Sequence, residues 1–172
     1  MNELQREYPE EIERILAKYP PEYKRSAVMP LLYLAQRRQG YIPPQAIEEI
    51  AQILGLSTTE VASVAGFYSL FHEEPGGRWR IQVCTDLPCA LRGADEFLKN
   101  LCEALGVTVG GTTTDGLFTV EEVKCLAACH RAPVFQLQSG SEIKYYENQS
   151  IDTVLALVEE LRRRAESEKE GV

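Results

Sequence analysis

Histidine is scarce in this sequence of 172 residues, and its two copies are His72 and His130. Neither stands in a Cys-x-His arrangement, which excludes a Rieske iron-sulfur centre because that centre needs two histidine ligands. The five cysteines include no Cys-x-x-Cys pair, so disulfide exchange of the thioredoxin type is not expected.

Long hydrophobic runs are also absent. The longest nearly apolar stretch, Val61 to Phe71, is only about half as long as the roughly 20 residues that a membrane-spanning helix needs. The opening residues 1–10 are polar and mixed in charge, unlike the basic start and apolar core of a secretory signal. We therefore expect a cytoplasmic protein without direct membrane contact, in which any membrane association comes through partners.

The sequence has fewer basic than acidic residues. The chain has 18 Lys and Arg against 26 Asp and Glu, which gives a formal net charge of -8. Such a charge repels phosphate backbones and anionic lipid surfaces, so we expect no nucleic acid among the partners. The partners expected from this charge are other proteins. Because 44% of the residues are hydrophobic and 26% are charged, as in ordinary globular proteins, the chain is expected to fold.

Helical periodicity fills the first part of the chain, and we predict an N-terminal helical bundle over residues 1–74. Pro20 and Pro21 end the first helix, and Gly40 and Gly55 end the next two. The sequence 57–60, Ser-Thr-Thr-Glu, is a capping box that begins a fourth helix at Thr58. The apolar stripes of the four helices are Ile12, Ile15, Leu16 and Tyr19; Leu31, Leu32, Leu34 and Ala35; Ile47, Ile50, Ala51 and Leu54; and Val61, Val64, Ala65 and Tyr68.

The turn-rich residues 73–77 separate this bundle from a second predicted unit, residues 78–165, and a charged, mobile tail is expected at 166–172. The order of the elements in the second unit suits a small α+β or α/β layer fold in which helices cover a sheet, and thioredoxin-like folds are among the simplest of that kind. The predicted strands are Arg78 to Cys84, Leu117 to Val123, Pro133 to Gln138 and Glu142 to Tyr146, and the predicted helices are Leu91 to Leu105 and Ile151 to Arg164.

Four cysteines form two pairs, each of which follows a predicted strand and enters a loop. The pairs are Cys84 with Cys89 and Cys125 with Cys129. In such loops backbone N-H groups are free to point at sulfur, and two pairs can converge on one inorganic centre. Thiolate suits iron-sulfur clusters, zinc and Cu(I), so the donor type alone does not choose among them.

Several interpretations of these cysteines can be compared. A structural zinc site stays open, because zinc ligands are commonly two to four residues apart. A plant-type ferredoxin is excluded, since the cysteine it needs is replaced by Arg92. Cys102 lies among leucines on a helix and is expected to be a core residue. His130 follows a candidate ligand. Two positions are open for its side chain: a hydrogen bond near the cluster, or an ordinary place on the surface.

A second function class is an iron-sulfur transcription regulator, because residues 47–68 resemble a helix-turn-helix. Charge argues against it. The would-be recognition helix, Thr58 to Leu70, contains Glu60 and no Lys or Arg that could neutralise a phosphate.

Taken together, these residues resemble the thioredoxin-like [2Fe-2S] subunit of respiratory complex I, NADH:quinone oxidoreductase. The resemblance covers nearly the whole chain and is carried by the cysteine pairs and three further stretches. These stretches are 40–43 (Gly-Tyr-Ile-Pro), 66–69 (Gly-Phe-Tyr-Ser) and 125–133 (Cys-Leu-Ala-Ala-Cys-His-Arg-Ala-Pro).

The resemblance implies a bundle that docks on a flavin- and NADH-binding partner subunit, and a thioredoxin-like [2Fe-2S] ferredoxin domain after it. FMN and NADH then belong to the partner, and this chain takes one electron from the reduced flavin without catalytic residues of its own. The implied cluster ligands are Cys84, Cys89, Cys125 and Cys129. Similar subunits serve NAD-reducing hydrogenases and NAD-dependent formate dehydrogenases, and the sequence does not separate these complexes.

Two positions differ from the family pattern. Lys124 stands where an acidic residue is frequent, and Ala127 stands where glycine is frequent. A cation beside Cys125 should favour the reduced, more negative cluster and raise its potential. The alanine is expected to permit ligation.

Overall fold

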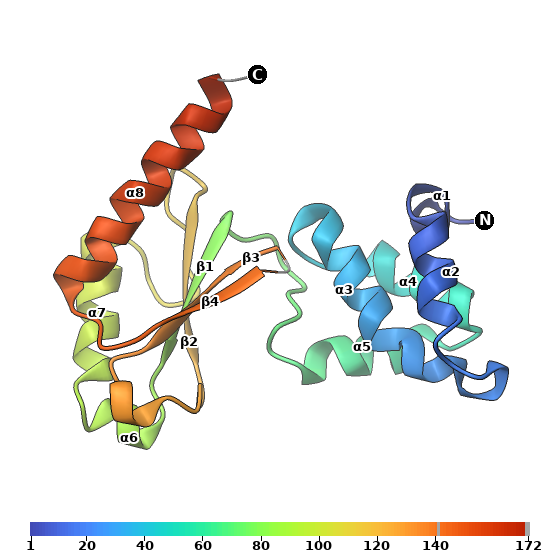
Figure 1. Cartoon of the computed structure of the whole chain (residues 1–172), viewed down its shortest axis with the longest axis horizontal. Helices are drawn as coiled ribbons and strands as arrows, with labels where there is room; N and C mark the ends of the chain where they lie inside the picture. The colour runs from blue at the N-terminus through green and yellow to red at the C-terminus, as the bar shows by residue number, and fades with distance from the viewer. Residues whose placement is uncertain (141, 171–172) are drawn as a thin grey trace. The chain divides into compact units, whose positions relative to one another are not determined.

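The computed structural model describes residues 1–140 and 142–170. It divides into two compact units, Met1–Pro75 and Gly76–Val172 (Figure 1). Each unit has its own hydrophobic core. Within the described residues, no helix combines the length and the apolar content that crossing a membrane requires.

The N-terminal unit is entirely helical. Its elements are α1 (Glu3–Glu7), α2 (Pro9–Leu16), the 3-10 helix η1 (Pro21–Ala27), α3 (Val28–Gln39), α4 (Pro44–Leu54) and α5 (Thr58–Phe67). The four predicted helices are confirmed, whereas α1 and η1 were not predicted. Gly40 and Gly55 end α3 and α4 in the left-handed conformation, and the Ser57 capping box begins α5 as expected.

A buried glutamine joins α3 to the segment that follows α5. The Gln36 side chain on α3 donates from Nε2 to the carbonyl of Leu70 at 2.8 Å, and its Oε1 accepts the backbone N-H of His72 at 2.8 Å. Gln36 is buried among Leu31, Leu32 and other apolar residues, where an unpaired amide would cost free energy. These bonds hold the segment after α5 against α3.

The second unit is built on a four-stranded sheet in the order β2-β1-β3-β4. β1 pairs in parallel with β2 and antiparallel with β3, and β3 pairs antiparallel with β4. The strands are β1 (Trp79–Cys84), β2 (Phe118–Val123), β3 (Phe135–Ser139) and β4 (Glu142–Tyr146). The helices are α6 (Leu87–Ala90), α7 (Ala94–Leu105), the 3-10 helix η2 (Cys129–Arg131) and α8 (Ile151–Glu170).

The helices α7 and α8 cover one face of this sheet (Figure 1). Alternate strand residues such as Ile81, Val120 and Phe135 pack there against Leu101 and Val158. The intervening residues of the strands form a different, hydrogen-bonded layer on the other face. In that layer Gln136 donates to Gln82, and Gln82 and Arg80 both donate to Glu121.

In the second unit, three boundaries differ by two residues or more from the sequence predictions. The helix expected from Leu91 begins at Ala94, because Gly93 adopts a left-handed φ of 88° that interrupts it, and Leu91 is 81% exposed. The third strand begins at Phe135, two residues later than predicted.

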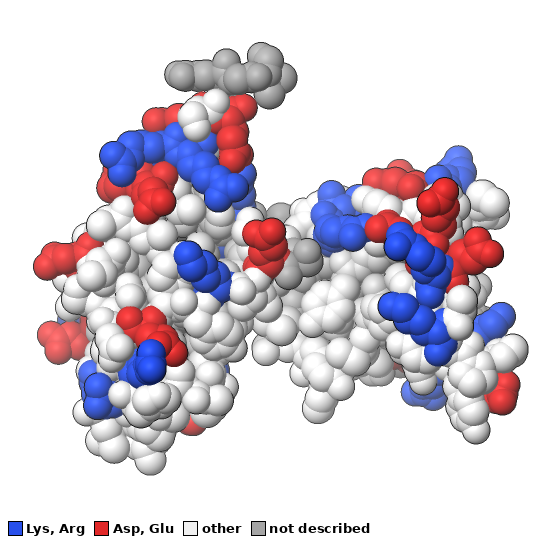
Figure 2. Space-filling model, in the orientation of Figure 1, with Lys and Arg blue, Asp and Glu red and all other residues white. Residues whose placement is uncertain are grey.

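The last helix continues to Glu170, so residues 166–170 are helical and the expected tail is wrong there. Arg164 bonds Glu168 one turn further along, and Glu168 also pairs with Arg78. The side chains of this end of α8 carry both charges side by side (Figure 2). Residues 171 and 172 of the predicted tail lie outside the described part.

Candidate iron-sulfur site

The four candidate ligands come from the ends of β1 and β2 and from the segments that follow them. Cys84 is the last residue of β1 and Cys89 lies in α6, and both are buried. Cys129 begins η2 and is half-buried, whereas Cys125 lies between β2 and η2 and is exposed. The helical position of Cys89 differs from the loop expected from the sequence.

The first pair is positioned by strand pairing. The Cys84 N-H donates to the carbonyl of Val134 at 3.1 Å, and the Thr85 N-H donates to the carbonyl of Val123 at 3.1 Å. Pro88 lies in the first turn of α6, where its missing N-H costs nothing. The chain therefore turns soon after β1, and Cys89 belongs to the same buried group as Cys84.

The second pair lies on an irregular segment. Ala127 has a φ of 58°, which is the left-handed region, and Ala128 follows with a φ of -118°. The Arg131 N-H donates to the carbonyl of Ala128 at 2.9 Å, and the Ala132 N-H donates to the carbonyl of Cys129 at 3.4 Å. This sharp turn returns the chain towards the start of β3.

Three of the four candidate thiols, those of Cys84, Cys89 and Cys129, lie close together. Burial, and then the neighbouring thiols of Cys84 and Cys129, raise the pKa of the Cys89 thiol to about 12. Around them is a small apolar group that excludes water from the two buried sulfurs, consisting of Ala94, Ala128, Ala132 and Val134, with Leu126 against it. The structure thus brings Cys84, Cys89 and Cys129 together and leaves the side chain of Cys125 exposed.

This donor set fits a two-iron cluster. In the described residues, no three His, Cys, Asp or Glu side chains are arranged as ligands of a single metal ion. A [2Fe-2S] cluster divides its four thiolates between two irons, so its ligands need not converge on one point. Metal coordination would also deprotonate the Cys89 thiol, whose raised pKa otherwise keeps it neutral.

Charged side chains surround the site. Lys124 donates to Glu122 at 2.5 Å, and this hydrogen bond lowers the pKa of Glu122 and raises the pKa of Lys124. Glu122 also accepts from the Thr85 hydroxyl at 2.7 Å. The Nε-H of Arg92 donates to the carbonyl of Ala132 at 3.2 Å.

The Arg92 contact could not be expected from local sequence patterns, because its partner is 40 residues away along the chain. The other two candidates can now be placed. Cys102 is buried in the core between the sheet and α7, as predicted. His130 is exposed, so the structure gives it an ordinary surface position.

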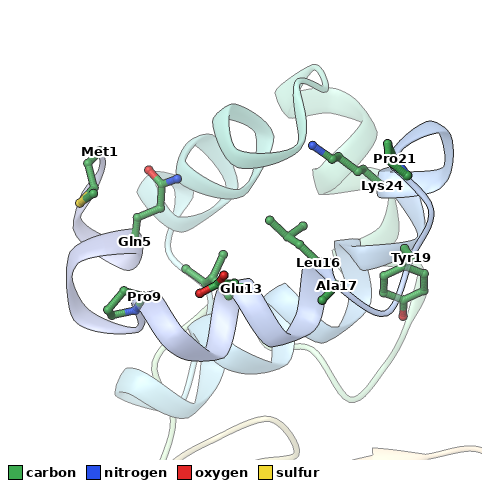
Figure 3. Close-up of a pocket in the computed structure, with 10 residues that line it drawn as sticks. Met1, Gln5, Pro9, Glu13, Leu16, Ala17, Tyr19, Pro21 and Lys24 are labelled. Carbon is green, nitrogen blue, oxygen red and sulfur yellow. The ribbon is translucent and has the colours of Figure 1, made fainter.

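Two cavities of the described part of the chain are lined by none of the four candidate ligands. One of about 490 Å³ lies in the N-terminal unit between α1, α2 and η1, and it is lined mainly by apolar residues (Figure 3). Its ionisable lining residues include Glu13 and Lys24, and it contains no cysteine. Another, of about 440 Å³, lies beside α7 and includes the buried Cys102.

Fold and site together define a small electron-transfer protein in which a thioredoxin-like sheet presents cysteines to an iron-sulfur cluster. The model of the thioredoxin-like [2Fe-2S] ferredoxin family matches residues 12–162, and the chain belongs to that family. Its cofactor is accordingly one [2Fe-2S] cluster. The predicted fold class, an α/β domain of this type after a helical N-terminal part, is confirmed.

Curated relatives match nearly the whole chain. NADH-quinone oxidoreductase subunit 2 of Thermus thermophilus is 42% identical over 160 residues, which cover 93% of this chain and 88% of the relative. A subunit of the NADH-quinone oxidoreductase of Rhizobium meliloti is 44% identical over 153 residues, covering 89% of this chain and 88% of the relative. The predicted resemblance to this family is confirmed.

Among solved structures, an NAD+-reducing [NiFe]-hydrogenase in the air-oxidised state superposes with a TM-score of 0.64 at 22% identity. The match covers 78% of this chain and 23% of the hydrogenase chain. At this identity the similarity shows the fold alone.

Proposed function

We propose that this chain is the electron-transfer subunit of an NADH:quinone oxidoreductase. In this proposal its [2Fe-2S] cluster exchanges one electron at a time with the flavin of a partner subunit. The observation that carries the proposal is the meeting of Cys84, Cys89 and Cys129 in a family member whose relatives are named as subunits of that oxidoreductase. The proposed ligands are Cys84, Cys89, Cys125 and Cys129.

The residues of this chain hold and shield the cluster. β1 and α6 present two buried thiolates, and the turn around Ala127 presents the other two from the opposite ligand segment. When bound, the cluster supplies a carrier for one electron, with a potential set by nearby charge, hydrogen bonds and exposure. No acid, base or nucleophile of this chain is required. Hydride chemistry on FMN and NADH belongs to the partner.

The proposed partners are the flavin- and NADH-binding subunit and further subunits of the same complex. The N-terminal bundle is proposed to dock on the flavin subunit. This is supported by exposed aromatic side chains on the bundle, because Phe67 is 79% exposed and packs edge-on against Tyr68. The proposed location is cytoplasmic and peripheral to the membrane through the complex.

A second candidate is the equivalent subunit of an NAD-linked hydrogenase or formate dehydrogenase. The sequence pattern does not separate these complexes, and part of a solved NAD+-reducing hydrogenase chain has the same fold. Affinity purification of the tagged chain from its own host separates the two. Membrane subunits that reduce quinone would support the first proposal, and a nickel-iron or molybdenum subunit would support the second.

The cofactor is tested by purifying the full chain without oxygen. We expect two iron and two sulfide per chain, visible absorption, and a rhombic EPR signal after reduction by dithionite. A colourless protein with one tightly bound zinc would overturn the electron-transfer proposal and leave a structural zinc module.

The ligand set is tested by replacing each proposed ligand with serine. Cys125→Ser is the most informative variant, because Cys125 is the exposed member of the set. We expect each variant to lose most of its iron or to change its EPR signal. Cys102→Ala is the matched control and should keep both. A wild-type signal in Cys125→Ser would remove that residue from the set.

A further inference from the structure

The two ligand segments come from distant parts of the chain, and a shared apolar group and several hydrogen bonds join them. At the strand ends, the Cys84 N-H donates to Val134 and the Thr85 hydroxyl donates to Glu122. Past the strand ends, the side chain of Arg92 reaches from one ligand segment to the other. Its Nε-H donates to the carbonyl of Ala132 at 3.2 Å.

Both ends of this contact are tied directly to ligands. The backbone N-H of Arg92 donates to the carbonyl of Cys89 at 3.0 Å, so the arginine belongs to the turn that holds Cys89. The backbone N-H of Ala132 donates to the carbonyl of Cys129 at 3.4 Å, and Ala132 is buried in the apolar group around the sulfurs. The Arg92 side chain therefore connects the turn of Cys89 to the turn of Cys129.

We propose that Arg92 is a positioning residue for the cluster: its side chain clamps the two ligand turns together, and its positive charge favours the reduced state. The inference rests on the proposed ligand set. It assigns Arg92 a part in holding the cluster and in setting its potential, although Arg92 is not a ligand.

Arginine has the chemistry that both roles need. Its planar guanidinium carries a directed Nε-H close to the chain, which the flexible ammonium of lysine does not reproduce. A thiolate-ligated cluster becomes more negative on reduction, so a nearby cation stabilises the reduced form by Coulomb attraction. Hydrogen-bonding groups outside the ligand shell also affect how firmly ligands hold a metal.

Two variants of the full chain separate the two roles. Arg92→Lys keeps the charge and loses the Nε-H, whereas Arg92→Leu loses both. Arg163→Leu removes an exposed arginine of α8, whose C-terminal half lies at the other end of the unit from α6 (Figure 1), and is the matched control. The measurements are an EPR-monitored redox titration and the rate of iron loss to a chelator.

Loss of the clamp should make both Arg92 variants release iron about tenfold faster than the wild type. Loss of the charge should lower the ratio of reduced to oxidised cluster in Arg92→Leu, at fixed applied potential, by about threefold to tenfold. This is a shift of roughly 30 to 60 mV for one electron. Arg92→Lys should keep the wild-type potential, and Arg163→Leu should change neither quantity.

Other outcomes would overturn the inference. A wild-type rate of iron release in both Arg92→Lys and Arg92→Leu would contradict the proposed clamp. A wild-type midpoint potential in Arg92→Leu would contradict the proposed effect of the charge. An Arg92→Leu protein that folds, as judged by circular dichroism, but retains no iron supports the clamp. A wild-type chain without an iron-sulfur cluster would instead refute the proposed function, so the two failures are distinguishable.

Discussion

At the scale of single residues, Ala127 is the most unusual position of the site. Its φ of 58° lies in the left-handed region, and Asn148 is the other non-glycine residue described with a positive φ. Alanine costs about 1 kcal/mol or more in this conformation, because its Cβ crowds the neighbouring carbonyl oxygen. By its resemblance to the family this alanine stands where glycine is frequent, and glycine adopts the left-handed conformation found here without that cost.

We predict that Ala127→Gly changes the free energy of unfolding little, because relief of about 1 kcal/mol is offset by the greater freedom of glycine in the unfolded chain. Ala128→Gly is the matched control. Since Ala128 has a negative φ and a buried methyl group, its replacement should destabilise the protein by about 1 kcal/mol. Urea unfolding of both metal-free variants measures this, and equal losses would contradict the prediction.

Lys124 leads to the second prediction at this scale. Its side chain is 77% exposed and paired with Glu122, so solvent and the partner carboxylate both weaken its field at the cluster. We expect Lys124→Glu to lower the midpoint potential, with a change in the ratio of reduced to oxidised cluster of about twofold to fivefold.

The measurement is a redox titration of Lys124→Glu, and the control is the same titration of Arg164→Glu. Arg164 is also exposed and paired with a glutamate, but it lies on α8. An unchanged or higher midpoint potential in Lys124→Glu would refute the prediction.

At the scale of elements, the sequence predicted best where a local signal marks a boundary. Gly40, Gly55 and the Ser57 capping box end or begin helices through contacts within a few residues, so α3, α4 and α5 were recognisable. α1 and η1 were missed because they are short. The predicted start of α7 was wrong because Leu91 continues the apolar stripe of the sequence, whereas the left-handed Gly93 separates Leu91 from the helix.

Contacts between distant segments could not be predicted in this way. The cysteine spacing pointed to the proposed ligands, but it did not show that Cys125 is exposed while Cys89 is buried. The strand order, with β1 between β2 and β3, depends on pairing across tens of residues. The bond from Arg92 to Ala132 depends on the same pairing, and no sequence pattern indicates it.

The capping box of α5 leads to a pH-dependent prediction. The backbone N-H of Ser57, then its hydroxyl, donate to the Glu60 carboxylate and lower its pKa. Stabilisation by Glu60 is therefore present above its unfolded pKa and is lost as the pH falls through the lower, folded pKa. Glu60→Ala should lower the melting temperature at neutral pH, and the difference from wild type should shrink below about pH 4.

The control for this prediction is Thr59→Ala, which changes the neighbouring first-turn residue. Its effect on the melting temperature should not depend on pH. If the Glu60→Ala difference persists unchanged at pH 3, the carboxylate is not the stabilising group.

At the scale of the whole molecule, the chain has one proposed redox group and no proposed site for NADH. We predict that NADH leaves the isolated, anaerobic protein oxidised, whereas dithionite reduces it. Addition of the purified flavin subunit should then allow NADH to reduce the cluster. Visible absorption and EPR follow both steps, and direct reduction of the isolated chain by NADH would contradict the division of labour proposed between the subunits.

The sheet order also has a consequence for how the protein is made. β1, which ends at Cys84, lies between β2 and β3, which come later in the sequence. On the ribosome, Cys84 is therefore synthesised roughly 2 to 9 seconds before Cys129. During that interval its future neighbours do not exist, and the thiols of the first pair are open to oxidation and stray metals. A cellular factor that delivers iron and sulfide can complete the site only after β3 has emerged and paired.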